Sequence, residues 1–349
     1  MQQVFAQRLK SARLIEGLTM EALANAIGVS KQMISKYEAA KSMPDSSVLL
    51  ALAKALHQKP DFFFRPHRIE IGKVEFRKKS RMPQAQSKAI AERVRAMLEN
   101  YLAVEEMLGI SYSFINPIAT NVIDSSSALE DALHQLREKW ELGLDPIVNI
   151  VELLEGREIK VLEIDSGSED FDGLATLAND RFPVVVVNKN FSIERKRFTL
   201  LHELGHLLLQ FPLEMDPREK EKWCHRFAAS FLLPEKAIKE ITTKRGDFAT
   251  REIELLQQRY GISFQAIVFR MSELNLISKE GQRRFFIRMR QDADFGAQVD
   301  KERFVGEETS HRFEALVYRA LTQGLISMSR ASGLLGVSVS EVHKTHQLL

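Results

Sequence analysis

The sequence predicts a multidomain chain: an all-α N-terminal domain, a mostly α-helical α+β domain with a small sheet, and a helical C-terminal segment. Three observations support this fold class. The 349 residues exceed the roughly 100 to 200 residues of a typical domain. Apolar residues recur at helical spacing near both ends of the chain, and short alternating segments gather between residues 158 and 188.

Charge is distributed unevenly along the chain. Residues 1–90 contain 16 Lys and Arg against 7 Asp and Glu, a net charge of +9, whereas the remaining residues contain 33 against 40, a net charge of −7. Such asymmetry indicates a nucleic-acid-binding end and a different task for the rest. The overall composition, 44% apolar and 28% charged, is that of a globular protein and excludes a fibre or a disordered tail.

No targeting or membrane segment is visible. The apolar runs, such as residues 184–187, are far shorter than the roughly 20 residues that cross a bilayer. The first ten residues lack the apolar core of a secretory signal. The single cysteine, Cys224, cannot form an internal disulfide and fits a reducing compartment. We therefore expect a cytoplasmic protein with no membrane partner.

Residues 1–66 predict a bundle of short amphipathic helices with an informative turn in the middle. Thr19 is placed to cap a helix that ends near Ile27, Gly28 to form a tight turn, and Ser30 to cap the next helix. Helix, short glycine-containing turn and helix make a helix-turn-helix unit.

The helix after Ser30 has a polar, basic outer face. A recognition helix presents its N-terminal residues to base edges in the major groove, which predicts base contacts by Lys31, Gln32, Ser35 and Lys36. Glutamine suits adenine, and lysine suits guanine. The other basic residues expected to contact the DNA would touch phosphates; these are Lys10, Arg13 and Lys41. Double-stranded DNA is thus a predicted partner.

Residues 18–56 resemble the XRE (Cro/repressor-like) helix-turn-helix family over their whole length. Two departures from the family pattern stand out. Met20 stands where the family often has a glutamine that contacts the backbone or a base, and Ala39 and Ala40 stand where a glycine usually ends the recognition helix.

Residues 67–125 predict a linker followed by a long helix over 84–108. The linker carries a basic cluster, which is either a solvated charge run or an additional phosphate contact; its members are Arg77, Lys78, Lys79 and Arg81. Beyond the linker, periodicity predicts a helix over 126–142, and Asp145-Pro146 predicts the start of another that ends near Gly156.

The third region, residues 126–285, is expected to form the α+β domain. Alternating segments predict three strands, at 158–165, 171–178 and 183–188. Ser192 is then placed to cap a helix that runs to about Gln210. The sequence therefore places the next motif on a helix that packs against a small sheet.

That motif is HELGH, from His202 to His206. Two histidines four residues apart lie on one helix face, so both imidazoles can reach one Zn²⁺ ion. Glu203 lies beside them and is the expected general base that acts on a water bound to the metal. The cofactor predicted from this spacing is zinc.

A catalytic zinc site needs a third protein ligand. A second helix is expected to begin near Glu219 and to end before Pro234, with Glu221, His225 and Ala228 on one face. Glu221 is the favoured third ligand, but spacing alone does not choose among acids. The alternatives are Glu214, Asp216, Glu219 and His225. We expect Cys224 to be a small buried side chain rather than a ligand.

The two segments RFTLLHELGHLLL and EKWCHRFAASFLLP resemble the ImmA/IrrE family of gluzincin-type metallopeptidases, as do the strand before them and YGISFQAIVFRMSELNLIS after them. The resemblance implies a zincin-like α+β fold, His202, His206 and Glu221 as zinc ligands, and Glu203 as general base. His225 stands where the family usually has Asn or Asp. The side chain at this position normally helps orient a ligand histidine without binding the metal itself.

The last region, residues 286–349, looks helical. Its sequence LLGVSVSEVH echoes AIGVSKQMIS of the N-terminal unit, so a second helix-turn-helix shape is expected. Its outward residues in the reader positions are Val339, Ser340 and Glu341, which suit a polyanion poorly. Packing or homodimerisation is therefore favoured over DNA contact.

These predictions combine into a DNA-binding transcriptional regulator with a zinc-dependent endopeptidase domain. Its substrate would be a regulatory protein such as a repressor or antitoxin, or the chain itself, an expectation that rests on analogy with the fold. Two other readings stay open: a transcription factor whose zincin-like domain senses a ligand or partner without proteolysis, and an antitoxin-like regulator that binds a partner through its C-terminal helices.

Overall fold

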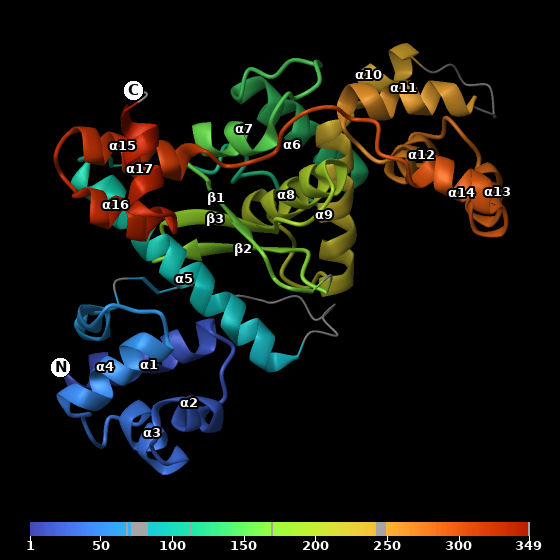
Figure 1. Ribbon diagram of the computed structural model, residues 1–349. Coiled ribbons are helices and arrows are strands. Elements are labelled where there is room, and N and C mark those ends of the chain that lie inside the picture. The colour runs from blue at the N-terminus through green and yellow to red at the C-terminus, as the bar shows by residue number, and fades with distance from the viewer. Residues whose placement is uncertain (68, 71–82, 112–113, 169, 242–248, 348–349) are drawn as a thin grey trace.

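A computed structural model describes residues 1–67, 69–70, 83–111, 114–168, 170–241 and 249–347. Within these ranges the chain is mostly helical, with one three-stranded sheet near the middle (Figure 1). The predicted fold class is confirmed. The basic cluster predicted in the linker lies outside the described residues. No helix of the described residues is long and apolar enough to span a membrane.

The N-terminal helices form a domain with its own apolar core. Its elements are α1 (Gln2–Ile15), α2 (Met20–Ile27), α3 (Lys31–Glu38), α4 (Ser46–Ala55) and the 3-10 helix η1 (Pro60–Phe64). Phe5, Leu23 and Leu52 are fully buried in its core. Thr19 and Ser30 accept hydrogen bonds from backbone N–H groups of α2 and α3, and Gly28 adopts φ 72° at the end of α2. The predicted helix-turn-helix is present.

The long helix α5 (Gln84–Met107) lies between this domain and the sheet (Figure 1). On one side α1 docks against it: Arg8 Nη1 donates to Glu99 Oε2 at 2.6 Å, and Arg93 Nη2 donates to the carbonyl of Ile15 at 3.0 Å. On its other side α5 packs with the sheet and with C-terminal residues in one apolar cluster. The segment predicted as linker and long helix thus contributes a helix to the core.

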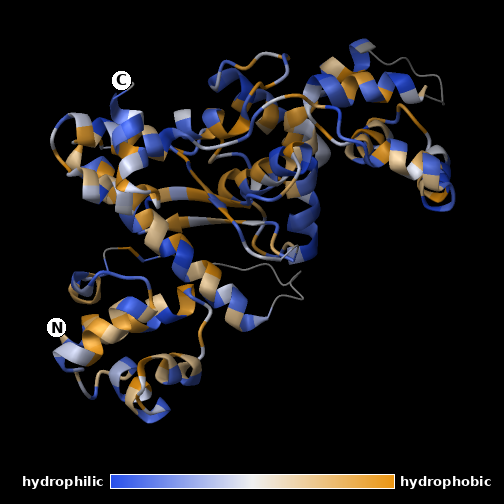
Figure 2. Ribbon diagram, in the orientation of Figure 1, coloured by the Kyte–Doolittle hydropathy of each residue, from blue (hydrophilic) through white to orange (hydrophobic). Residues whose placement is uncertain are grey.

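The sheet has the order β1-β3-β2, with β1 (Lys160–Ile164) parallel and β2 (Gly173–Ala178) antiparallel to the central β3 (Phe182–Asn188). Alternation along β3 sends its side chains to two different cores. Val185 and Val187 pack with α8 (Ile193–Leu208), whereas Val184 and Val186 pack with α5 and the C-terminal helices. The strands are correspondingly apolar and lie between helical layers (Figure 2).

The remaining helices extend the core on the α8 side. They are α6 (Ser126–Lys139), α7 (Ile150–Gly156), α9 (Pro217–Leu232), α10 (Glu235–Ile241), α11 (Thr250–Tyr260), α12 (Phe264–Glu273), α13 (Lys279–Gln291) and α14 (Ala293–Asp300). Helix α9 packs along α8, and α6 packs on α9. This arrangement brings the second predicted motif against the first.

The C-terminal segment forms α15 (Arg312–Thr322), α16 (Met328–Leu335) and α17 (Val339–Gln347). Gly336 ends α16 with φ 69°, and Ser338 and Glu341 exchange hydrogen bonds at the start of α17. The expected second helix-turn-helix shape is therefore present. Its helices share the α5 side of the sheet's core, through Val317 and Val342 among others. The predicted boundaries at 125/126 and 285/286 remain predictions.

One predicted helix start was wrong. Asp145-Pro146 does not begin a helix, because α7 begins at Ile150, where Asn149 accepts from the N–H of Glu152 and the Glu308 carboxylate accepts from the first two N–H groups. Helix α9 begins at Pro217, close to the predicted start near Glu219; Asp216 caps it, and proline suits the first helical position.

Candidate functional site

The HELGH motif lies in the last turns of α8, the helix that packs against the sheet. His202 and Glu203 are both 2% exposed, whereas His206, one turn later, is half-buried. The Nε2 atoms of the two histidines are 3.2 Å apart. The four-residue spacing thus brings the two imidazoles together on one helix face, as the sequence predicts.

Glu221 reaches the same point from α9. Its carboxylate oxygens lie 3.6 Å from Nε2 of His202 and 3.5 Å from Nε2 of His206. The two Nε2 atoms are thus 3.2 Å apart, and each lies within 3.6 Å of a different oxygen of the Glu221 carboxylate. The residue favoured as third ligand lies where a third ligand is needed.

These separations can be compared with the distances between ligand atoms around a bound metal ion. Zinc binds nitrogen and oxygen ligands at about 2.0–2.1 Å in a tetrahedron, which sets ligand atoms about 3.4 Å apart. The observed separations agree with that value, and two imidazoles with one carboxylate are a donor set that zinc uses in catalytic sites. The residues present fit a zinc ion, and their ligand roles remain predictions.

Close approach of the surrounding elements depends on two glycines. A Cβ added to Gly205, within the motif, would lie 3.4 Å from the backbone of Cys224 and 3.3 Å from the Phe227 ring. A Cβ on Gly173, at the start of β2, would lie 2.8 Å from the carbonyl oxygen of Val186 and 3.1 Å from Cγ of Glu203. The absence of side chains at these positions lets α9 and β2 close on the motif.

Two further residues of α9 contact the histidines. The Cys224 Sγ lies 3.6 Å from Nδ1 of His206, the ring nitrogen that faces away from Glu221. The His225 ring centroid lies 4.3 Å from that of His202 and 5.9 Å from that of Phe198. Contacts to the second nitrogen of a ligand histidine fix its orientation. Cys224 is buried as expected, but its contact with His206 was not predicted.

The contact between Cys224 and His206 could have been predicted from the sequence spacing. Cys224 follows Glu221 by three residues, and side chains at i and i+3 share a helix face. The open alternatives for the third ligand lie elsewhere: Glu214, Asp216 and Glu219 are exposed, and Asp216 is engaged as the cap of α9. Among the described residues, one group of possible metal-ligand donors within 4.8 Å of one another contains His202, Glu221 and His225.

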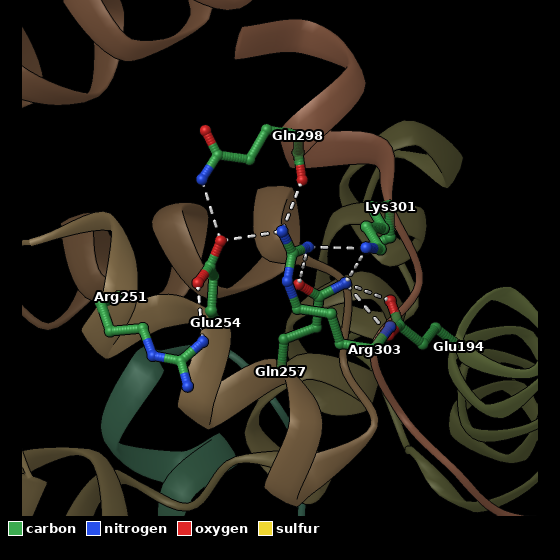
Figure 3. A network of polar contacts seen from close by, with 7 residues as sticks. All are labelled: Glu194, Arg251, Glu254, Gln257, Gln298, Lys301 and Arg303. Carbon is green, nitrogen blue, oxygen red and sulfur yellow. Dashed lines mark hydrogen bonds and ion pairs between the residues drawn. The ribbon is translucent and has the colours of Figure 1, made fainter. Parts of the chain in front are cut away.

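The segment between α14 and α15 forms hydrogen bonds with the first turn of α8. Figure 3 shows Arg303 of this segment among residues of α11 and α14, with Nη2 donating to Glu254 Oε1 and Nη1 to Gln257 Oε1, each at 2.9 Å. The Glu194 carboxylate, in the first turn of α8, accepts from Gln257 and from the backbone N–H of Arg303. The helix that carries the motif is thereby anchored at its N-terminal end.

A fully buried ion pair adds a second anchor. Arg197 of α8 and Glu308 are both 0% exposed and hydrogen-bonded to each other. Burial raises the pKa of Glu308 and lowers that of Arg197, and the charge of each partner opposes the shift of the other. Removing one partner of such a pair costs about 3–5 kcal/mol. The C-terminal segment is thus part of the scaffold that holds α8.

The second predicted site lies on α3, which Figure 1 shows at the outer end of the N-terminal domain. All of the residues predicted to contact DNA from this helix and the turn after it are exposed: Lys31, Gln32, Ser35, Lys36 and Lys41. Lys10 is exposed as well. These DNA contacts stay predictions, and the structure leaves the side chains accessible to a groove.

The predicted phosphate contact by Arg13 is wrong. Its side chain is buried and forms an ion pair with Glu38 at the end of α3, where Nη2 donates to Oε2 at 2.8 Å. Nη1 donates to the carbonyl of Leu18 at 2.8 Å. Because all of these contacts are internal, Arg13 joins α1 to α3 instead of reaching DNA.

Comparisons with known proteins divide the chain in the same way. Residues 9–63 match the model of the helix-turn-helix family, and residues 154–272 match the peptidase M78 model, described as the IrrE N-terminal-like domain. The second match contains all of the residues of the candidate metal centre and all three strands.

One curated relative is the SPbeta prophage-derived uncharacterized HTH-type transcriptional regulator YonR of Bacillus subtilis (strain 168), 32% identical over 62 residues. The match covers 18% of this chain and 57% of that protein. Among solved structures, the apo form of ComR from S. thermophilus aligns over 99% of this chain and 91% of its own, at 10% identity and a TM-score of 0.18. The chain thus joins an XRE-type helix-turn-helix domain to an IrrE/ImmA-like domain of the M78 peptidase family.

Proposed function

We propose that this chain is a DNA-binding transcriptional regulator whose second domain is a zinc-dependent endopeptidase. Its substrate is a regulatory protein of the repressor or antitoxin kind, or the chain itself. The observation that carries the proposal is the close approach of the His202, His206 and Glu221 donor atoms beside the buried carboxylate of Glu203.

Each residue of this group has a distinct part in peptide hydrolysis. His202, His206 and Glu221 would hold the zinc ion. When bound, zinc polarises a peptide carbonyl and lowers the pKa of water to about 7. The Glu203 carboxylate accepts the proton of the attacking water and passes it to the leaving amine. Burial of Glu203 keeps competing water away from this transfer.

The sheet edge beside Glu203 suits an extended peptide. Among the described residues, β2 is one of the two edge strands of the sheet, and its first residue, Gly173, lies against the Glu203 side chain. An extended chain can pair with such an edge through main-chain hydrogen bonds. This supports a polypeptide substrate, because the backbone of an edge strand lies close to Glu203.

The test is a pair of measurements on Glu203→Gln in the full chain. Metal analysis should find about one zinc per chain in the wild type and the variant, and the variant should lose cleavage of a co-expressed repressor or antitoxin substrate. Glu219→Gln, an exposed acid of the same helix as Glu221, is the matched control and should cleave normally. Cleavage that survives Glu203→Gln would refute the enzymatic role.

A second candidate function is favoured by His225. A histidine this close to His202 is also suited to a zincin-like domain that senses a metal, a ligand or a partner without proteolysis. Such a regulator should change its DNA affinity when zinc is added, with no new fragments on a gel. The Glu203→Gln variant should then respond to zinc as the wild type does, which separates the two functions.

A further inference from the structure

His225 belongs to the metal centre by position. It follows Glu221 by four residues on α9, so both side chains lie on the helix face that meets α8. Its ring stands beside that of His202, with centroids 4.3 Å apart. A neutral imidazole is among the commonest zinc ligands.

Two of the predicted ligands also group with His225. One ligand atom each from His202, Glu221 and His225 lies within 4.8 Å of the other two. Ligands around tetrahedral zinc are about 3.4 Å apart, so the His225 nitrogen must move closer to the other donors to bind the same ion. The χ2 torsion of histidine is broad, and rotation of the ring allows such a movement.

We propose that His225 is a fourth protein ligand, so that the resting centre binds zinc through three histidines and one glutamate. This inference rests on the zinc site of the proposed function and concerns its regulation. Structural zinc sites have four protein ligands, whereas catalytic ones keep one position open for water or substrate. Held by these four residues, a zinc ion would have no open position, and the resting centre would be closed.

A stacking role for His225 is the alternative that an experiment must separate. The ring lies between Phe198 and His202 and is within 25° of parallel to Phe198. A residue that only packs against His202 would position that ligand without contributing a nitrogen to the metal. The two roles differ in the number of imidazoles bound to zinc.

The test counts those imidazoles by zinc X-ray absorption spectroscopy on the full chain loaded with one Zn²⁺. The wild type should show three imidazoles and His225→Asn two. Two imidazoles in the wild type would overturn the inference and leave the proposed zinc site intact. A wild type that binds no zinc would overturn both, so the two failures are distinguishable.

Metal affinity gives a second readout that does not depend on cleavage. His225→Asn should bind zinc at least about 10-fold more weakly in a competition titration with a chelator, because a donor is lost. The control is His134→Asn, which changes an exposed histidine of α6 and should bind as the wild type does. His225→Phe keeps an aromatic ring beside His202 without a donor; wild-type affinity in this variant would refute ligation by His225.

Discussion

The two helix-turn-helix units, α2–α3 and α16–α17, use the same backbone solution for different surfaces. In each, a glycine with φ near 70° ends the first helix, and a serine two residues later caps the second. The exposed faces differ at the first two positions: α3 presents Lys31 and Gln32, whereas α17 presents Val339 and Ser340. Local capping signals therefore specify the shape, and the outward side chains decide what the shape can bind.

The units also differ in how the preceding helix is joined to the second helix. Arg13 of α1 and Glu38 of α3 form a buried pair. At the corresponding place, Thr322 of α15 and His346 of α17 share one exposed hydrogen bond of 3.3 Å. Buried charged pairs are far more costly to break than exposed neutral contacts. Matched changes in the two units test the difference in their internal contacts and the difference in their exposed side chains.

The largest effect is expected for Arg13→Ala. The change leaves the Glu38 carboxylate buried without its ion pair, which should lower the stability of the first unit by about 3–5 kcal/mol. Hydrogen-exchange mass spectrometry of the full chain measures this as faster exchange of α3 amides. His346→Ala is the matched change in the second unit and should cost less than about 1 kcal/mol. Equal losses in the two units would contradict the contrast.

The next effect concerns DNA. Replacing Gln32 and Lys36 with Ala should lower specific affinity, because each good base contact is worth about 1–3 kcal/mol. The matched control is the pair Ser340→Ala and Lys344→Ala, at the same positions of α17, which should leave the affinity unchanged. Fluorescence anisotropy at fixed salt with the operator measures both. Loss of affinity in the α17 variant would mean that the second unit also reads DNA.

Sequence patterns predicted both units because their signals are local. Caps, glycine turns and apolar periodicity act within about ten residues, and Thr19, Gly28 and Ser30 have the roles their spacing predicts. The same holds for the HELGH face of α8, where a spacing of four residues fixes the relation of two imidazoles. Glu221 was favoured as the third ligand from its place on a helix face. Its distance from the two histidines depends on the packing of α9 against α8.

The features that were missed depend on distant residues. The start of α7 is set in part by Glu308, which lies more than 150 positions away in the sequence and accepts from Ile150 and Val151. The burial of Arg13 depends on a partner 25 residues on. A basic residue on a basic helix looks like a phosphate contact until its partner is known, because composition does not say which lysines and arginines are paired inside.

A smaller effect is expected at the end of α3. Ala40 adopts φ 55°, whereas Gly28 and Gly336 hold the comparable positions after α2 and α16. The left-handed region costs a non-glycine residue about 1–2 kcal/mol. Glycine avoids this cost but loses more backbone entropy on folding, which offsets part of the gain. Ala40→Gly should therefore stabilise the first unit by about 0.5–1 kcal/mol. Ala39→Gly, at φ −87°, is the control and should destabilise it, so the same sign for both would refute this account.

The smallest effect is a difference in pH response. Hydrogen bonds from Ser338 lower the pKa of Glu341 at the start of α17, whereas the fourth position of the first unit's cap is Met33, which does not titrate. A lowered folded-state pKa gives stability that is present above the unfolded value of about 4.3 and lost as pH falls through the folded value. The amide resonance of Ser338 should thus shift with a midpoint below about 4.3 in an NMR titration. The Ser30 amide should show no such step, and Glu341→Gln should abolish the step at Ser338; a step that persists in that variant would mean that another carboxylate accepts from this cap.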